Sequence, residues 1–193
     1  MLVLSFVGIS RERDRALAES QRTLLVSELL IDLLELPDPV RAVAFNRFAA
    51  SHISEKAAFL VDGDLKDDPE LRVAFLIAVG RVTRNLGDLE RAWQLFESAR
   101  AAEPPADRPD LSLELNYRVA ELAIGTDRFD EAWTAIEAMG TLAPSSSFEP
   151  VWRARSLALE AMWLDKMGKG GALEAIERGL EWIDGEQEPL VTS

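Results

Sequence analysis

Two segments of this chain repeat one pattern at a spacing of 40 residues. The first is GDLERAWQLFESARAAEP, at positions 87–104, and the second is DRFDEAWTAIEAMGTLAP, at positions 127–144. Each starts with turn residues, continues with acidic residues and an Ala-Trp pair, and ends at a proline. Self-similarity at such a period is typical of stacked helical pairs, because one pair cannot bury its apolar face alone. The repeat therefore predicts an array of helical hairpins.

The remaining sequence also favours helices over strands. Alternating runs rich in Val, Ile and Tyr are missing, whereas Ala, Leu, Glu and Arg dominate. Apolar residues recur every three or four positions between turns that Gly and Pro mark. The expected fold is all-α, with about nine helices joined by short turns. We place these helices at residues 11–36, 40–50, 53–65, 71–85, 88–102, 111–124, 128–142, 151–167 and 172–183.

Small residues stand at fixed places in the clearest repeat. The expected first helix has a large residue followed by a small one, Val79-Gly80. The expected second helix has a small, an aromatic and a small residue at Ala92, Phe96 and Ala99. This pattern resembles the tetratricopeptide repeat, a helix–turn–helix unit of about 34 residues.

A second unit matches the same family pattern less completely. Val119-Ala120, Ala132 and Ile136 match, whereas Met139 stands where a small residue is expected. The resemblance implies a right-handed superhelix of antiparallel helix pairs, a tetratricopeptide-like α-solenoid, forming a single domain over residues 1–193. Its expected parts are an N-terminal helix at 1–36, repeats at about 38–71, 73–106, 113–146 and 150–184, and a C-terminal tail at 185–193.

Close packing of antiparallel helices explains why small residues are needed. Two helices approach to about 8–10 Å only where the side chains at the contact are small. We expect Ala92 to lie at the crossing point and to face Gly80 and Val79. Phe96 then fills the space where the helices diverge, and Ala99 lets the next hairpin come close.

Charge and composition exclude several classes of partner. The net charge of −13 argues against nucleic acid and against an anionic membrane surface. The chain has no cysteine, which fits a cytoplasmic protein. The apolar run at 2–9 is far shorter than the ~20 residues that cross a bilayer. Arginines follow this run, whereas a secretory signal has its basic residues in front of the apolar run. We interpret this run as part of the fold or as a homodimer contact.

Three local motifs that suggest chemistry fail on inspection. His52 is the single histidine and lies between two expected helices, with nothing nearby to form a catalytic triad. The acidic run at 62–70 lacks the ligands of a calcium loop, and the Gly-Lys run at 167–172 lacks the residues of a phosphate loop. We therefore expect no enzyme activity, no cofactor and no metal site.

The resemblance implies that a ligand lies on the concave side of the array, which the first helix of each pair lines. The residues that it places there are Asn46, Ile77, Ala78, Arg81, Arg84, Asn85, Tyr117, Arg118, Glu121 and Arg155. Arginines beside a tyrosine can anchor a carboxylate-bearing peptide. The alternative is that these arginines pair with local acids such as Glu114 and Glu121.

The leading hypothesis is a protein-interaction scaffold or adaptor that binds a peptide or partner helix, with an acidic segment as the favoured ligand. The alternative is a regulatory sensor that binds a signal peptide or a small ligand in the same groove. An enzyme on a helical scaffold is the third reading, and the sequence supports it least.

Overall fold

The computed structural model describes residues 63, 65 and 68–184. The chain divides into two compact units, Met1–Phe45 and Asn46–Ser193, and every described residue belongs to the second. The helices expected at 11–36 and 40–50 lie outside the described residues, as does nearly all of the one expected at 53–65. The same holds for the apolar N-terminal run and for the C-terminal tail.

Six α-helices and one short 3₁₀ helix make up the described part of the chain. Each α-helix begins and ends within two residues of its predicted limits, and no strand occurs among the described residues. The all-α prediction is therefore confirmed for this part of the chain. The elements are α3 (Pro69–Asn85), α4 (Leu89–Ala101), α5 (Pro109–Gly125), α6 (Phe129–Leu142), η2 (Ala143–Ser145), α7 (Glu149–Lys166) and α8 (Ala172–Asp184).

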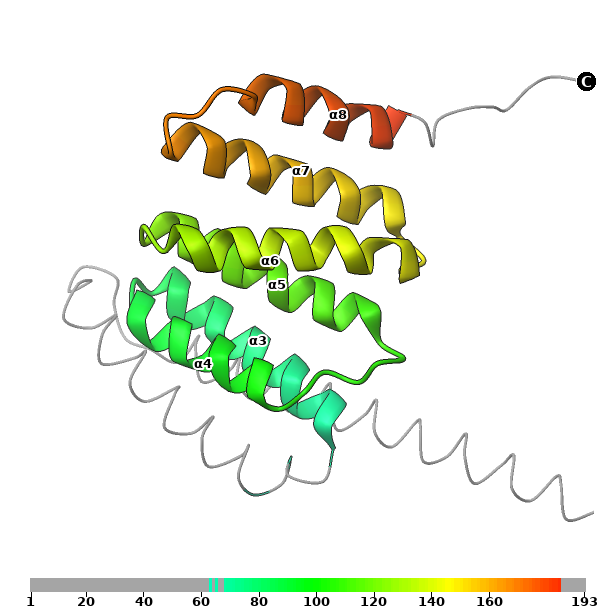
Figure 1. Cartoon of the computed structure of the whole chain (residues 1–193). Coiled ribbons are helices and arrows are strands. Elements are labelled where there is room, and N and C mark those ends of the chain that lie inside the picture. Colours follow the sequence, from blue (N-terminus) through cyan, green and yellow to red (C-terminus); the bar gives the residue numbers. More distant parts are fainter. Residues whose placement is uncertain (1–62, 64, 66–67, 185–193) are drawn as a thin grey trace, which may run out of the picture. The chain divides into compact units, whose positions relative to one another are not determined.

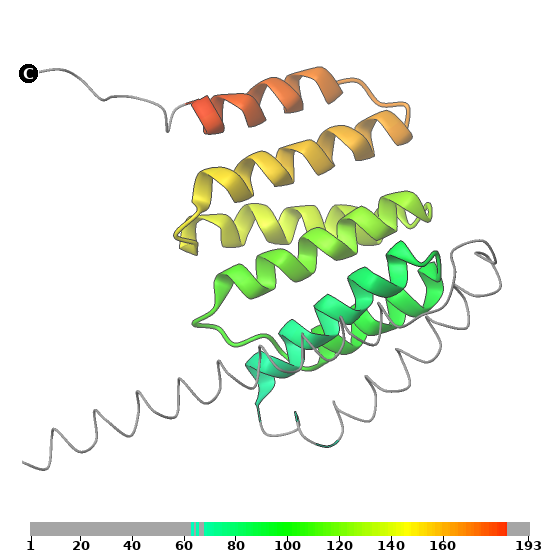
Figure 2. The ribbon, with the colours of Figure 1, turned by 180° about the vertical axis from the view of Figure 1, so that it is seen from behind.

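The helices pack as three hairpins in chain order, α3–α4, α5–α6 and α7–α8 (Figure 1). Neighbouring hairpins meet where α4 contacts α5 and where α6 contacts α7. The first helices also meet, α3 with α5 and α5 with α7, as the reverse view shows (Figure 2). As a result α3, α5 and α7 share one surface.

The turns inside the first two described hairpins use one backbone conformation. Gly87 follows α3 with φ of 88°, and Asp127 follows α5 with φ of 59°. The left-handed region is open to glycine and, among other residues, is tolerated best by Asp and Asn. The third hairpin has Gly168 at φ of 62° in its turn. The turn residues of the sequence pattern thus close each hairpin in the same way.

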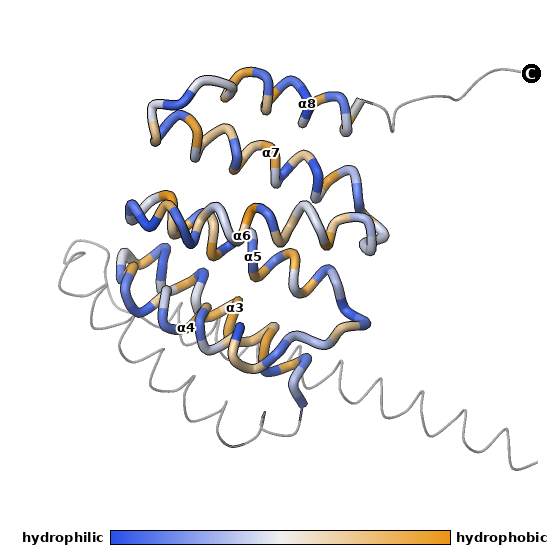
Figure 3. Tube along the Cα trace, in the orientation of Figure 1, coloured by the Kyte–Doolittle hydropathy of each residue, from blue (hydrophilic) through white to orange (hydrophobic). Residues whose placement is uncertain are grey.

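The small residues of the repeat are buried as predicted. Ala92, Ala99 and Ala132 have no exposed surface. Along the Cα trace, hydrophobic and hydrophilic residues alternate within each helix, as an amphipathic packing requires (Figure 3).

The contact that Gly80 makes differs from the prediction. A Cβ at Gly80 would lie 2.4 Å from Cε1 of Phe96, and the three nearest atoms all belong to that ring. Gly80 therefore faces Phe96 rather than Ala92. The aromatic ring needs a residue without a side chain opposite it, because Phe96 is itself fully buried.

Tryptophans link the second and third hairpins. The indole nitrogen of Trp163 donates to the carbonyl of Phe129 at 2.9 Å, and that of Trp152 donates to Asp110 at 3.2 Å. The rings of Trp133 and Trp163 lie 4.7 Å apart. Trp152 and Trp163 are both buried, so these contacts belong to the core of the described helices.

Candidate functional site

A groove of about 450 Å³ lies on the surface that the three first helices share. We call it the first-helix groove. Its lining residues are Ala74, Ile77, Ala78, Arg81, Leu111, Glu114, Arg118 and Arg155. They come from α3, α5 and α7, which is where the family resemblance places a ligand.

Helical spacing explains why these side chains share one face. Ala74, Ala78 and Arg81 follow one another at intervals of four and three in α3, so they project from the same side. Leu111 and Glu114 stand three residues apart at the start of α5. The groove is thus lined by small and apolar residues together with long charged side chains.

The carboxylate of Glu114 joins all three first helices. It accepts from Arg118 in its own helix, with 2.7 Å between Nη2 and Oε1. Arg81 of α3 and Arg155 of α7 approach the same carboxylate, each at 3.9 Å. Their side chains are 52% and 45% exposed, so solvent screens both longer pairs strongly. Glu114 therefore binds one arginine closely and holds two others loosely.

A second carboxylate is held much more tightly. Glu121 of α5 accepts two hydrogen bonds from the guanidinium of Arg84 in α3, and the one from Nη2 is 3.0 Å long. Arg118 adds a contact to Glu121 at 3.3 Å. Paired bonds between a guanidinium and a carboxylate are stronger and more specific than single ones. This pair fixes α3 against α5.

Aromatic rings hold two of the arginines in place. The guanidinium carbons of Arg118 and Arg155 lie 4.9 and 5.5 Å from the ring centre of Tyr117. Arg155 also lies 4.7 Å from the ring of Trp152. Cation–π contacts of this kind orient a guanidinium without neutralising its charge.

The arginines of this surface outnumber its acids. Among the residues that line the groove, Arg81, Arg118 and Arg155 stand against Glu114 alone, so the lining has a net charge of +2. The whole chain has a net charge of −13. The first-helix groove is therefore a positive site on a strongly negative protein.

The structure separates the predicted site residues into groups. Ile77, Ala78, Arg81, Arg118 and Arg155 line the groove. Of the remaining residues, Arg84 and Glu121 pair with each other, Tyr117 lies beneath the arginines, Asn85 is exposed at the end of α3, and Asn46 lies outside the described residues.

The four arginines differ in how closely they pair with local acids. Arg84 and Arg118 pair with local acids, as the alternative holds. Arg81 and Arg155 keep much of their surface exposed.

Sequence reasoning missed two apolar residues that line the groove. Ala74 lies one turn before Ala78, and Leu111 lies three residues before Glu114. Extending the predicted face toward the helix N-termini, by one turn in α3 and by two turns in α5, would have found both.

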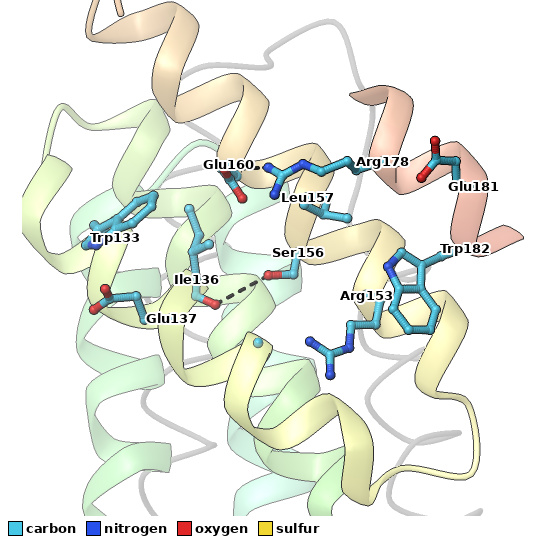
Figure 4. A pocket seen from close by; sticks show the side chains of 11 residues that line it. Trp133, Ile136, Glu137, Arg153, Ser156, Leu157, Glu160, Arg178, Glu181 and Trp182 are labelled. Atoms are coloured by element: carbon cyan, nitrogen blue, oxygen red, sulfur yellow. Dashed lines mark hydrogen bonds and ion pairs between the residues drawn. The ribbon is translucent and has the colours of Figure 1, made fainter. Parts of the chain in front are cut away.

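A second groove, of about 420 Å³, lies between α6 and α8 over α7 (Figure 4). Trp133 and Trp182 flank it, with Ile136, Ser156 and Leu157 between them. Its charged residues are Glu137, Arg153, Glu160, Arg178 and Glu181, which sum to a net charge of −1.

The arginines of this second groove are already paired. Arg178 donates to Glu160 at 2.9 Å, and Arg153 donates to Glu149 at 3.3 Å while lying 5.3 Å from the ring of Trp182. The second groove thus offers no excess charge of the kind that the first-helix groove has.

Metal clusters and membrane-spanning helices are both missing from the described residues. There, no group of three or more His, Cys, Asp or Glu residues is placed to hold a metal ion. None of the helices described is both long and apolar enough to span a bilayer.

Comparison with protein-family models, with curated proteins and with solved structures gave no match to this chain.

Proposed function

We propose that this chain is a non-enzymatic protein-interaction scaffold of the tetratricopeptide type, which binds an acidic peptide segment in the first-helix groove. The observation that carries the proposal is that Arg81 and Arg155 are exposed and only loosely paired. Both guanidiniums lie at the groove, both are about half exposed, and they share one carboxylate at 3.9 Å. A carboxylate of a ligand can replace such weak internal pairs at small cost.

The arrangement of the helices supports the fold that this proposal assumes. Three hairpins contact one another in chain order, and buried alanines recur at matched positions in the first two. The proposed arrangement is a right-handed superhelix with the first helices on its inner side. The chain contains no cysteine, and we propose the cytoplasm as its compartment.

Glu114 acts in this proposal as an internal competitor of the ligand. It occupies the position between Arg81, Arg118 and Arg155 where an incoming carboxylate would bind. Removing its charge would leave three guanidiniums without their shared partner. Glu114→Gln should therefore raise the affinity for an acidic peptide, whereas most substitutions in a binding site lower it.

The test uses the full chain and two synthetic peptides of equal length, one rich in Asp and Glu and one rich in Lys. We expect the acidic peptide to bind, with an affinity that falls as salt rises. The variant Arg81→Glu/Arg155→Glu should weaken binding by at least about tenfold, which corresponds to ~1.4 kcal/mol.

The matched control is Arg100→Glu/Lys166→Glu, which changes net charge equally at exposed positions outside the groove. It should bind the acidic peptide almost as the original chain does. Equal weakening by both double variants would mean that only the overall charge matters, and the proposal would fail. An unchanged or lower affinity of Glu114→Gln would contradict the role given to that carboxylate.

A further inference from the structure

The last described helix buries little more than its smallest residues. Against α7, α8 buries Ala175 and Gly179, and a Cβ at Gly179 would lie 3.4 Å from the Cβ of Leu157. The large apolar residues of α8 are exposed instead. They are Leu173, Ile176, Leu180, Trp182 and Ile183, with Leu173 at 66% and Leu180 at 53% exposure.

Four of these residues form one stripe. Leu173, Ile176, Leu180 and Ile183 follow one another at intervals of three, four and three. This is the spacing by which one helix packs along another, because it keeps the apolar residues on one side. The α8 stripe, as we call these four residues, is therefore arranged to receive a helix.

The preceding hairpin shows what covers the position that corresponds to Ile176 of the stripe. The sequence pattern gives Ala175 the place in α8 that Ala132 has in α6, so Ile176 corresponds to Trp133. Trp133 packs against Trp163 of α7, at 4.7 Å between ring centres. At this one position, therefore, α6 is covered by the following helix, whereas α8 leaves Ile176 exposed.

The flanks of the stripe are acidic. Glu174, Glu177 and Glu181 are exposed, and within the described part of the chain none of them forms an ion pair. The one basic residue of α8, Arg178, is bound to Glu160 of α7. A second copy of α8 would bring like charges together, which disfavours self-pairing.

The hairpin junctions already show how first-turn acids are satisfied. Arg108, just before α5, binds Glu70 in the first turn of α3. Arg128, just before α6, binds Glu90 in the first turn of α4 at 2.8 Å. In both cases the following hairpin supplies the cation. Glu174, in the first turn of α8, has no such cation beside it in the described part of the chain, and a covering helix could supply one.

We propose that the α8 stripe is a docking surface for an amphipathic helix of a partner protein, with an apolar face for the stripe and basic residues along its edges. This surface is separate from the first-helix groove and takes a partner of opposite charge to the one proposed there. The chain would then bridge a basic helix and an acidic segment.

The test uses the full chain and two synthetic peptides of about 18 residues, long enough to form helices. Both carry leucines at heptad spacing, and they differ only in having Lys or Glu at the flanking positions. We expect the Lys-flanked peptide to bind and the Glu-flanked peptide to bind at least about tenfold more weakly. Equal binding of the two, or binding of neither, would overturn the proposal.

Leu173→Ser/Leu180→Ser tests the stripe itself, because it leaves every charge in place. It should abolish binding of the Lys-flanked peptide, whereas Val151→Ser/Met162→Ser, at exposed apolar positions of α7, should not. If the Lys-flanked peptide still binds the Leu173→Ser/Leu180→Ser variant, the binding is non-specific attraction to an acidic protein, and the proposal is wrong.

Two further measurements exclude the other occupants. If the unliganded chain sediments as a dimer that Leu173→Ser/Leu180→Ser dissociates, a second copy covers the stripe and the proposal is wrong. If that variant instead lowers the melting temperature by more than about 4 °C without peptide, another segment of the same chain covers it. We expect the unliganded chain to sediment as a monomer and the variant to keep the melting temperature of the original chain.

Discussion

The hairpins α3–α4 and α5–α6 begin their helices in two different ways. In the first hairpin both helices start at an aspartate that caps its own helix. Asp68 accepts from the amide of Leu71 at 2.9 Å, and Asp88 accepts from the amide of Arg91 at 3.1 Å. Such a cap satisfies one of the free amides in the first turn of a helix.

Forty residues later, arginines stand at both positions. Neither Arg108 nor Arg128 caps its helix with a side-chain hydrogen bond. Each instead binds a glutamate in the preceding hairpin, and Arg128 also lies 4.2 Å from the centre of the Trp93 ring. The comparison shows one repeat position used for stability within a helix in one hairpin and for contact between hairpins in the next.

The same two hairpins also differ in how they fill their cores. Gly80 and Phe96 in the first hairpin correspond to Ala120 and Ile136 in the second. All four residues are buried. The larger side chain thus occurs with the smaller partner, and the total volume is kept nearly constant. Cores tolerate exchanges that conserve volume much better than exchanges that change it.

The largest expected effect comes from removing the bulky member of each pair. Phe96→Ala should lower the free energy of unfolding by about 3–5 kcal/mol, because it deletes a fully buried ring. Ile136→Ala should cost less, because it removes fewer atoms. Urea unfolding of both variants measures the difference. A larger loss for Ile136→Ala would show that the second hairpin depends more on its core than the first.

A smaller effect is expected from overfilling the helix crossings. Ala92→Leu and Ala132→Leu each insert bulk at a position with no exposed surface, which should cost ~1–3 kcal/mol. The two losses should be similar, because both alanines hold the same place in the repeat. Thermal unfolding followed by circular dichroism checks this. A melting temperature equal to that of the original chain would refute the placement of the repeat.

The smallest effect concerns the two kinds of helix start. Asp88→Ala removes a cap and should cost ~0.5–2 kcal/mol. Arg128→Ala removes an exposed ion pair and should cost less than about 1 kcal/mol at low salt, and less still at high salt. Urea titrations at two salt concentrations separate the two, since a cap to a backbone amide is less sensitive to screening. An equal salt dependence would abolish the distinction.

The sequence was sufficient to predict the six described helices and most of the groove face. Turn residues and proline mark the helix limits, and small residues mark the crossings. These features depend on residues that are close in sequence, so they can be predicted without the structure. The family resemblance placed Arg81 and Arg118 on the surface of the first helices, and both line the first-helix groove.

Contacts between helices were harder to predict. The contact between Gly80 and Phe96 depends on the relative position of α3 and α4 along their axes. The role of Glu114 depends on the reach of three arginine side chains from three helices. Spacing within one helix does not determine such distances, because they are set by how whole helices pack against one another.

The central claim is that a small residue on one helix and a large residue on the other hold the two helices of a hairpin together. A double-mutant cycle at Gly80 and Phe96 tests this claim. Gly80→Ala alone should destabilise by ~1–3 kcal/mol, although alanine is intrinsically the better helix former. Gly140→Ala is the control, because nothing lies within 4 Å of a Cβ there, and it should stabilise by ~0.5–1 kcal/mol.

Adding Phe96→Ile to Gly80→Ala recreates the pair found in the second hairpin. The double variant should be more stable than the sum of the two single changes predicts, by at least about 1 kcal/mol of coupling in urea unfolding. Strictly additive losses would contradict the account, because they would mean that the two residues do not depend on each other.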